Sequence, residues 1–269
     1  MKRVKNIILI TVLAVLAVTM TGCTYTASSE TDEDSKKNGT KLEGGYAMIS
    51  FYSYVEYVTG YYFAYKLTYD YDYYQKKKST LNALLDELGE SFKNNGYDVT
   101  VNNFSGEMIA SLSFKRTEDY LKYTDYDGFA PQDSSYDSIE KKVFYIDRTS
   151  KSKTLFADIE KEYKFIGRIY SVGCVKAGID KDNVLLQYVY GTPYKEKFLR
   201  SNADYVVYSA ENNLYLHVFK MTMDTHDKEV ILINHVPNTK VWYAISIAAG
   251  VVFFAIPLTI YLIKRKKKE

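Results

Sequence analysis

The sequence predicts an α+β fold in which a mostly antiparallel sheet is covered by one main amphipathic helix, followed by one C-terminal transmembrane helix. Three observations predict it. Short segments with alternating apolar and polar residues recur along the chain, one segment has helical periodicity, and a long run near the C-terminus carries no charge. Helical segments are too few to connect the strands of a doubly wound parallel sheet.

Residues 1–22 have the layout of an export signal of the lipoprotein type. Three basic residues precede an apolar stretch from Ile7 to Val18, and small polar residues follow it. The tetrad Met20-Thr21-Gly22-Cys23 resembles a bacterial lipobox, in which the cysteine receives diacylglycerol and becomes the new N-terminus, although leucine is usual where Met20 stands. Cleavage without lipidation and an uncleaved helix remain alternatives. We expect lipidation at Cys23.

Residues 23–45 contain the lipidated cysteine and a tether. The stretch from Thr24 to Gly45 is poor in large apolar residues and rich in Ser, Thr, Asp, Glu, Lys and Gly. Such a composition cannot bury enough apolar surface to offset the entropy of ordering, so we expect a disordered segment.

Residues 46–240 form the predicted extracytoplasmic domain, which is long enough to bury a core without disulfides. The segment from Tyr46 to Tyr74 holds 11 of the 28 tyrosines and alternates repeatedly, which predicts strands, with Gly60 as a bend between two pieces. One or two domains are compatible with this length.

The clearest helix follows, because five apolar residues fall at helical spacing and form one face. Ser79 or Thr80 is the expected N-terminal cap, and Asn94-Asn95-Gly96 supplies a left-handed residue at the end. The apolar face consists of Leu81, Leu84, Leu85, Leu88 and Phe92.

Further strands are predicted on both sides of a polar region. Tyr97 to Val101 and Glu107 to Phe114 are expected to pair, followed by a short helix at Thr117 to Tyr123 and a loop at Asp125 to Ser138. Asn212-Asn213 and Thr225-His226-Asp227 are expected as hairpin turns joining the last three strands. The later strands are predicted at Lys142 to Ile146, Phe165 to Val175, Val184 to Tyr190, Tyr205 to Ser209, Leu214 to Met223 and Glu229 to Val236.

Residues 241–263 form the predicted transmembrane helix. These 23 uncharged residues would extend ~34 Å at ~1.5 Å per residue, enough to cross a hydrocarbon core of ~30 Å. Trp242 and Tyr243 are suited to the outer headgroup layer, and the basic tail, residues 264–269, is a positive-inside signal. We therefore expect a single-pass protein of the cell membrane with an extracytoplasmic body and a cytoplasmic C-terminus.

The net charge limits the classes of partner, and the cysteine content indicates the role of Cys174. Without the eight basic residues and one acidic residue at the two ends, 27 Lys and Arg face 32 Asp and Glu. This net charge of −5 argues against nucleic acid as a partner. Cys23 and Cys174 are the two cysteines, and if Cys23 is acylated, Cys174 is expected to be a buried small hydrophobe.

Candidate reactive groups have ordinary structural interpretations. His217, His226 and His235 lack the short spacing of a metal site, so we predict no metal and no cofactor. Asp70 and Asp72 are expected as solvated carboxylates on one strand face. Serine-nucleophile and phosphate-loop motifs are missing from the sequence, which predicts a protein that is not an enzyme, with no catalytic residues.

Two surface features remain open to a binding role. The basic run Lys76-Lys77-Lys78 could meet anionic headgroups or could be a solvated helix start. The tyrosine-rich strands could present an aromatic binding surface, or could have one buried face and one solvated face.

Three stretches of the sequence resemble the LppM-type bacterial membrane lipoproteins: Thr21-Gly22-Cys23, Leu84 to Phe114, and Pro237-Asn238 shortly before Trp242-Tyr243. Residues 134–204 show no motif that resembles this family. The resemblance implies an export signal with a lipobox, an α+β domain likened to lipid-binding folds, and a basic-tailed C-terminal helix. Envelope glycolipids are the ligands that it implies.

The first function hypothesis is a non-enzymatic, membrane-anchored lipoprotein that binds membrane lipids or glycolipids at the outer face of the cell membrane. The alternative is an accessory or sensor subunit that docks other envelope proteins through its tyrosine-rich strands. The binding residues are not predictable from the sequence under either hypothesis.

Overall fold

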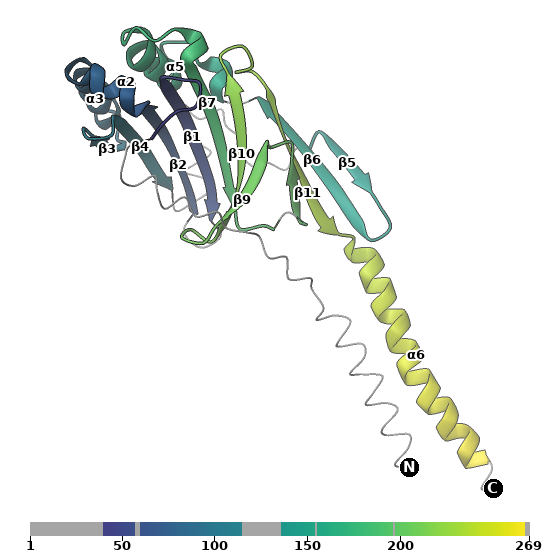
Figure 1. The fold of residues 1–269 in the computed structure, drawn as a ribbon. Helices are drawn as coiled ribbons and strands as arrows, with labels where there is room; N and C mark the ends of the chain where they lie inside the picture. Colours follow the sequence, from purple (N-terminus) through teal and green to yellow (C-terminus); the bar gives the residue numbers. More distant parts are fainter. Residues whose placement is uncertain (1–39, 57–59, 115–135, 154, 196, 267–269) are drawn as a thin grey trace. The chain divides into compact units, whose positions relative to one another are not determined.

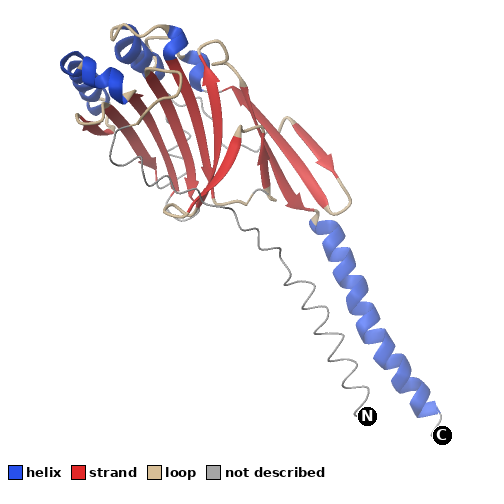
Figure 2. Ribbon diagram, in the orientation of Figure 1, coloured by secondary structure: helices blue, strands red, loops and turns tan. Residues whose placement is uncertain are grey.

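The computed structural model describes residues 40–56, 60–114, 136–153, 155–195 and 197–266. Their strands form two sheets, as Figures 1 and 2 show. The larger sheet has seven strands in the order β3-β4-β2-β1-β7-β10-β9, and the smaller has four in the order β5-β6-β11-β8. The predicted α+β class with mostly antiparallel pairing is confirmed, since β1 and β7 form the one parallel pair among the described strands.

The strands of the larger sheet are β1 (Ala47–Glu56), β2 (Gly60–Tyr69), β3 (Asp98–Asn102), β4 (Glu107–Phe114), β7 (Val184–Thr192), β9 (Tyr205–Ser209) and β10 (Leu214–Thr222). Those of the smaller sheet are β5 (Ser138–Lys141), β6 (Tyr145–Lys153), β8 (Leu199–Ser201) and β11 (Glu229–Pro237). The helices are α2 (Tyr71–Lys76), α3 (Lys78–Lys93), α5 (Phe165–Tyr170), a π-helical turn η3 (Ser171–Val175) and α6 (Thr239–Lys266), with short 3-10 turns η2 (Leu155–Asp158) and η4 (Lys181–Asn183).

The core lies between the seven-stranded sheet and α3, α5 and η3. Alternate residues of β1 and β2 point toward the helices because strand side chains have a period of two, and Phe51, Phe63 and Tyr65 are almost fully buried there. Helix α3 contributes its predicted apolar face, in which Leu84 is half-buried and the other four residues are fully buried. The close fit is visible at Gly173, where an added Cβ would lie 2.5 Å from Leu67 Cδ2.

The predicted C-terminal end of α3 is confirmed, and the predicted N-terminal cap is wrong. Gly96 has the expected left-handed conformation, with φ at 84°. The N-terminal cap is Lys77 rather than Ser79 or Thr80, and it forms no side-chain capping hydrogen bond. Helix α2 ends at Lys76, directly before this residue, so the backbone enters α3 from a preceding helical turn and both hydroxyl residues fall inside α3.

The strand predicted through Tyr74 is wrong beyond Tyr69. The Asp70 carboxylate accepts a hydrogen bond from the Tyr73 backbone N–H at 3.0 Å and caps α2. Aspartate is a strong N-terminal cap, and this local bond ends the strand and starts a helix. Asp70 and Asp72 therefore do not share a strand face, and Asp70 is buried rather than solvated, while Asp72 is exposed as expected.

The strand predicted at Phe165 to Val175 is also wrong, because the segment is helical. Ile166, Ile169 and Val172 are buried at intervals of three residues, a helical spacing that the abundance of β-branched residues conceals. An added Cβ on Gly167 would lie 2.0 Å from the Lys161 carbonyl oxygen, so the glycine permits a close backbone approach here.

The predicted turn at Thr225-His226-Asp227 does not close a hairpin, since β10 pairs within the larger sheet and β11 within the smaller. The turn at Asn212-Asn213 does close one, and Asn213 adopts a positive φ of 54°. The strand predicted at Lys142 begins only at Tyr145 and extends to Lys153. The helix predicted at Thr117 to Tyr123, and most of the loop predicted at Asp125 to Ser138, lie outside the described residues.

Helix α6 follows β11 directly (Figure 1). Residues Thr239–Arg265 form 27 residues of helix, and the most apolar 18-residue window within it has a mean hydropathy of 2.2 and is not buried. By length and composition it can span a membrane, as predicted for residues 241–263.

Candidate functional site

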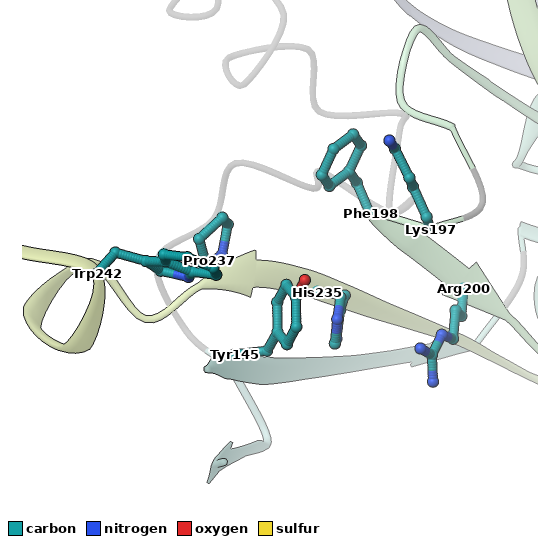
Figure 3. Close-up of a pocket in the computed structure, with 7 residues that line it drawn as sticks. All are labelled: Tyr145, Lys197, Phe198, Arg200, His235, Pro237 and Trp242. Carbon is teal, nitrogen blue, oxygen red and sulfur yellow. The ribbon is translucent and has the colours of Figure 1, made fainter. Parts of the chain in front are cut away.

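A cavity of about 560 Å³ lies where the four-stranded sheet meets the first turn of α6. Figure 3 shows that its side chains come from β6, β11 and β8, from the segment leading into β8, and from α6. The lining residues are Tyr145, Lys197, Phe198, Arg200, His235, Pro237 and Trp242.

The strand register explains why these residues meet. On β11, Ile233, His235 and Pro237 are alternate residues and so share one face of the sheet. Ile233 is opposite Arg200 of β8, while Pro237 is opposite Tyr145 of β6. Leu199 and Leu232 point to the other face and are buried in the core. The cavity therefore occupies the outer face of the smaller sheet.

A buried carboxylate supports the floor of the cavity. Asp147, opposite His235 in the register, accepts hydrogen bonds from Lys142 Nζ at 2.8 Å and from His235 Nδ1. The hydrogen bonds from Lys142 and His235 hold the pKa of the Asp147 carboxyl below its usual value, and the hydrogen bond to Asp147 raises the pKa of Lys142. The His235 ring stacks on Tyr145 with centroids 4.3 Å apart. Asp147 thus fixes the orientation of the imidazole.

The cavity carries positive charge from Lys197 and Arg200. Asp147 is already engaged by Lys142 and His235. Within the described part of the chain, neither Lys197 nor Arg200 forms an ion pair. Lys197 Nζ lies 4.9 Å from the centroid of the Phe198 ring. Two exposed cations beside aromatic side chains suit a ligand that has both an anionic group and an apolar part.

Trp242 places the cavity at the foot of the candidate membrane-spanning helix. Its indole Nε1 donates to the Phe144 carbonyl at 3.3 Å, and its ring lies 5.8 Å from that of Phe144. Tryptophan favours the headgroup layer of a bilayer. The ligand of this cavity would therefore sit at the level of lipid headgroups if α6 spans a membrane.

The three histidines do not come together at one site. His217 Nδ1 lies 2.7 Å from Ser201 Oγ, His226 Nδ1 lies 2.6 Å from the Met223 carbonyl oxygen, and His235 contacts Asp147. No group of three or more His, Cys, Asp or Glu residues is arranged to hold a metal ion in the ranges that the structure describes.

The basic run is divided between the end of α2 and the start of α3. Lys77 Nζ donates to Tyr73 Oη at 2.8 Å, and Lys78 Nζ lies 5.8 Å from the Phe104 ring centroid. Phe104 belongs to the turn between β3 and β4, and neither Lys77 nor Lys78 lines the cavity.

The tyrosines divide between core and surface. Tyr65, Tyr69 and Tyr74 are fully buried, while Tyr52 and Tyr54 are half-buried and their ring centroids are 6.0 Å apart. Both project from the sheet face opposite Phe51, which packs in the core. Tyr57 lies outside the described residues, as does Cys23.

Cys174 is a fully buried free cysteine, as predicted, and burial raises the pKa of its thiol. Sequence reasoning did not single out Lys197, Phe198 or Arg200. The run Lys195-Glu196-Lys197-Phe198-Leu199-Arg200 mixes cations with an aromatic residue, and this was the available signal.

No family model, curated protein or solved structure matches the chain.

Proposed function

We propose that this protein is a membrane-anchored extracytoplasmic lipoprotein that binds, without catalysis, a lipid or glycolipid at the outer face of the cell membrane. The observation that carries the proposal is the cavity at the foot of α6, where aromatic rings and two exposed cations meet at the first turn of a helix able to span a membrane. Lipid headgroups of that leaflet are the ligands within reach of such a site.

The chemistry of the lining supports an amphipathic ligand. Tyr145, Phe198 and Trp242 provide apolar rings that can contact sugar faces or the upper part of acyl chains. Arg200 and Lys197 can donate charge-assisted hydrogen bonds to a phosphate or carboxylate. No group on the floor is positioned as a nucleophile by a neighbouring base, since the Asp147–His235 pair is held by Lys142.

Anchoring at both ends belongs to the same proposal. Lipidation at Cys23 and the cytoplasmic position of the basic C-terminal tail rest on the sequence, through the lipobox-like tetrad and the positive-inside pattern. Together with α6 they would hold the smaller sheet close to the bilayer. The resemblance to the LppM-type lipoproteins supports the same ligand class.

The test is lipid binding by the full chain in nanodiscs, measured through Trp242, the one tryptophan of the protein. Nanodiscs of phosphatidylcholine receive increasing fractions of extracted envelope lipids. Binding in the cavity should change the emission of Trp242 saturably. Changing Lys197 and Arg200 to Gln should weaken that response by about tenfold for each cation removed, because a hydrogen bond to a charged group contributes about 1.5–3 kcal/mol.

The matched control is Lys220→Gln. Lys220 Nζ lies 5.2 Å from the Tyr205 ring centroid, an arrangement similar to Lys197 above Phe198 but away from the cavity. The control should respond like the unaltered protein. Equal responses of all variants would contradict a headgroup site in this cavity.

The alternative function, docking of another envelope protein, is favoured by strand β9. It is an edge strand of the seven-stranded sheet, and Tyr205, Val207 and Tyr208 are 40%, 47% and 46% exposed. An apolar edge strand can pair with a strand of a partner. Crosslinking in intact cells tests it: a specific partner lost when Val207 becomes Lys, or when Tyr52, Tyr54 and Tyr57 become Ser, would support docking.

A further inference from the structure

The turn between β5 and β6 carries large apolar side chains into solvent. Val143 is 67% exposed and Phe144 is 46% exposed, and both stand at the tip of the hairpin between Lys142 and Tyr145. The described residues leave much of both side chains uncovered, so the tip offers apolar surface to a partner.

Hydrogen bonds fix this tip to the start of α6. The Asn238 backbone N–H donates to the Phe144 carbonyl at 2.8 Å, and its side-chain amide donates to the carbonyls of Lys142 and Val143 at 3.3 and 3.2 Å. Trp242 adds a fourth hydrogen bond and a ring contact to Phe144. The height of the tip along α6 is therefore set by the first turn of the helix.

From this geometry we infer that the hairpin tip is a second membrane contact, in which Val143 and Phe144 insert into the headgroup region of the leaflet that α6 enters. The occupant of the apolar tip is the lipid surface, because the tip lies against Trp242 at the end of a helix that can span the bilayer. A Phe144 ring in contact with an interfacial tryptophan must lie at the same depth. This inference needs no ligand in the cavity.

The lysines beside the hairpin tip are compatible with a position in the headgroup region. Lys142 is the closest cation, and its ammonium is held by Asp147 at 2.8 Å and Glu140 at 3.5 Å, so it can remain at the water side. Lys141 is exposed and forms no ion pair among the described residues. Lysines that flank apolar residues at a membrane surface extend toward lipid phosphates.

The consequence is a fixed orientation of the smaller sheet. A single helix leaves the attached domain free to rotate about the helix axis, whereas a second contact removes that freedom. Tyr145 follows the tip directly and lines the cavity, so insertion of Val143 and Phe144 would keep the cavity mouth at headgroup level.

The experiment uses the full chain in phosphatidylcholine–phosphatidylglycerol nanodiscs, with a fluorophore sensitive to polarity at Val143→Cys. The background is Cys23→Ala, and the buried Cys174 stays unlabelled. Phe104→Cys is the matched control, because Phe104 is an 84% exposed aromatic residue in the turn between β3 and β4 of the other sheet. Lipids brominated near the glycerol serve as quenchers, and Trp242 reports the depth of the helix.

The proposal predicts that Trp242 and the probe at position 143 are both quenched by the brominated lipids, and that the probe at 143 is several-fold less accessible to aqueous iodide than the probe at 104. In a second variant, Val143→Asp should shift Trp242 emission to longer wavelength, while Phe104→Asp should leave it unchanged. If Trp242 is quenched but the probes at 143 and 104 behave alike, or if Trp242 is not quenched at all, the proposal is overturned.

Discussion

Ser201 Oγ on β8 lies 2.7 Å from Nδ1 of His217 on β10, and this hydrogen bond joins the two sheets. His217 is fully buried, and burial lowers its pKa to about 4. The folded protein therefore keeps this imidazole neutral under mildly acidic conditions in which an unfolded chain would protonate it. The contact between the sheets is thus linked to pH.

The first prediction concerns acid stability. Since the folded pKa of His217 is lower than the unfolded value of about 6.5, the unfolded state binds more protons between pH 6.5 and 4, and stability falls as pH decreases through that window. From pH 7.5 to pH 5 the loss due to His217 should be about 2 kcal/mol. Urea unfolding at the two pH values should show this loss in the unaltered chain and lack it in His217→Gln.

His226 and His235 are present in both proteins, so the difference between the two pH dependences isolates His217. Parallel pH dependences for the two proteins would contradict a neutral buried imidazole.

Asp147 gives a second prediction, in which stability again falls with decreasing pH but at a lower pH than for His217. Hydrogen bonds from Lys142 and His235 lower its pKa, so its stabilising effect is present above the unfolded pKa of about 4 and is lost as pH falls through the lower folded value. Replacement by Ala leaves both partners unsatisfied and should cost about 1–3 kcal/mol at pH 7 in urea unfolding. Glu140→Gln, on a 69% exposed side chain, is the control and should have little effect.

The packing of α3 gives a third prediction. Leu85 is fully buried against the sheet, so Leu85→Ala should cost about 2–5 kcal/mol by removing contacts and leaving a cavity. Leu84 is only half-buried, so Leu84→Ala should lower the free energy of unfolding by clearly less than Leu85→Ala. Thermal unfolding of the full chain in detergent, followed by near-ultraviolet circular dichroism, would measure both. Equal costs would contradict the orientation of the helix.

The anchoring proposal gives a fourth prediction, on Cys23. Cys23→Ala should abolish incorporation of labelled fatty acid and leave an uncleaved precursor of higher mass. α6 should still hold the protein in the membrane fraction, since a spanning helix anchors more strongly than one lipid chain. Undiminished labelling in the variant would rule out lipidation at this position.

Local sequence patterns predicted most of the helices and strands. Strand β4 matches its predicted bounds, and the apolar spacing in α3 identified its buried face. The helix at Phe165 was missed because its side chains are rich in β-branched and aromatic residues, so composition suggested a strand. The separation of β10 and β11 into different sheets depends on contacts across the whole chain, which a turn signal cannot reveal.

The candidate site was harder to predict than the fold, because it depends on contacts between residues far apart in the sequence. Tyr145, Arg200, His235 and Trp242 come from four segments separated along the sequence. Strand register brings the first three together, and contacts with Phe144 position Trp242. The sequence shows His235 as one of three histidines, but its carboxylate partner Asp147 lies 88 residues earlier in the chain. No spacing rule links two such residues.

The most direct test of lipid binding is native mass spectrometry of the full chain ejected from nanodiscs that contain extracted envelope lipids. The account predicts one lipid or glycolipid retained per chain, beyond any covalent acyl group, and its loss when Lys197 and Arg200 are both changed to Gln. A chain that emerges without bound lipid, or that retains the same lipid in the double variant, would contradict it.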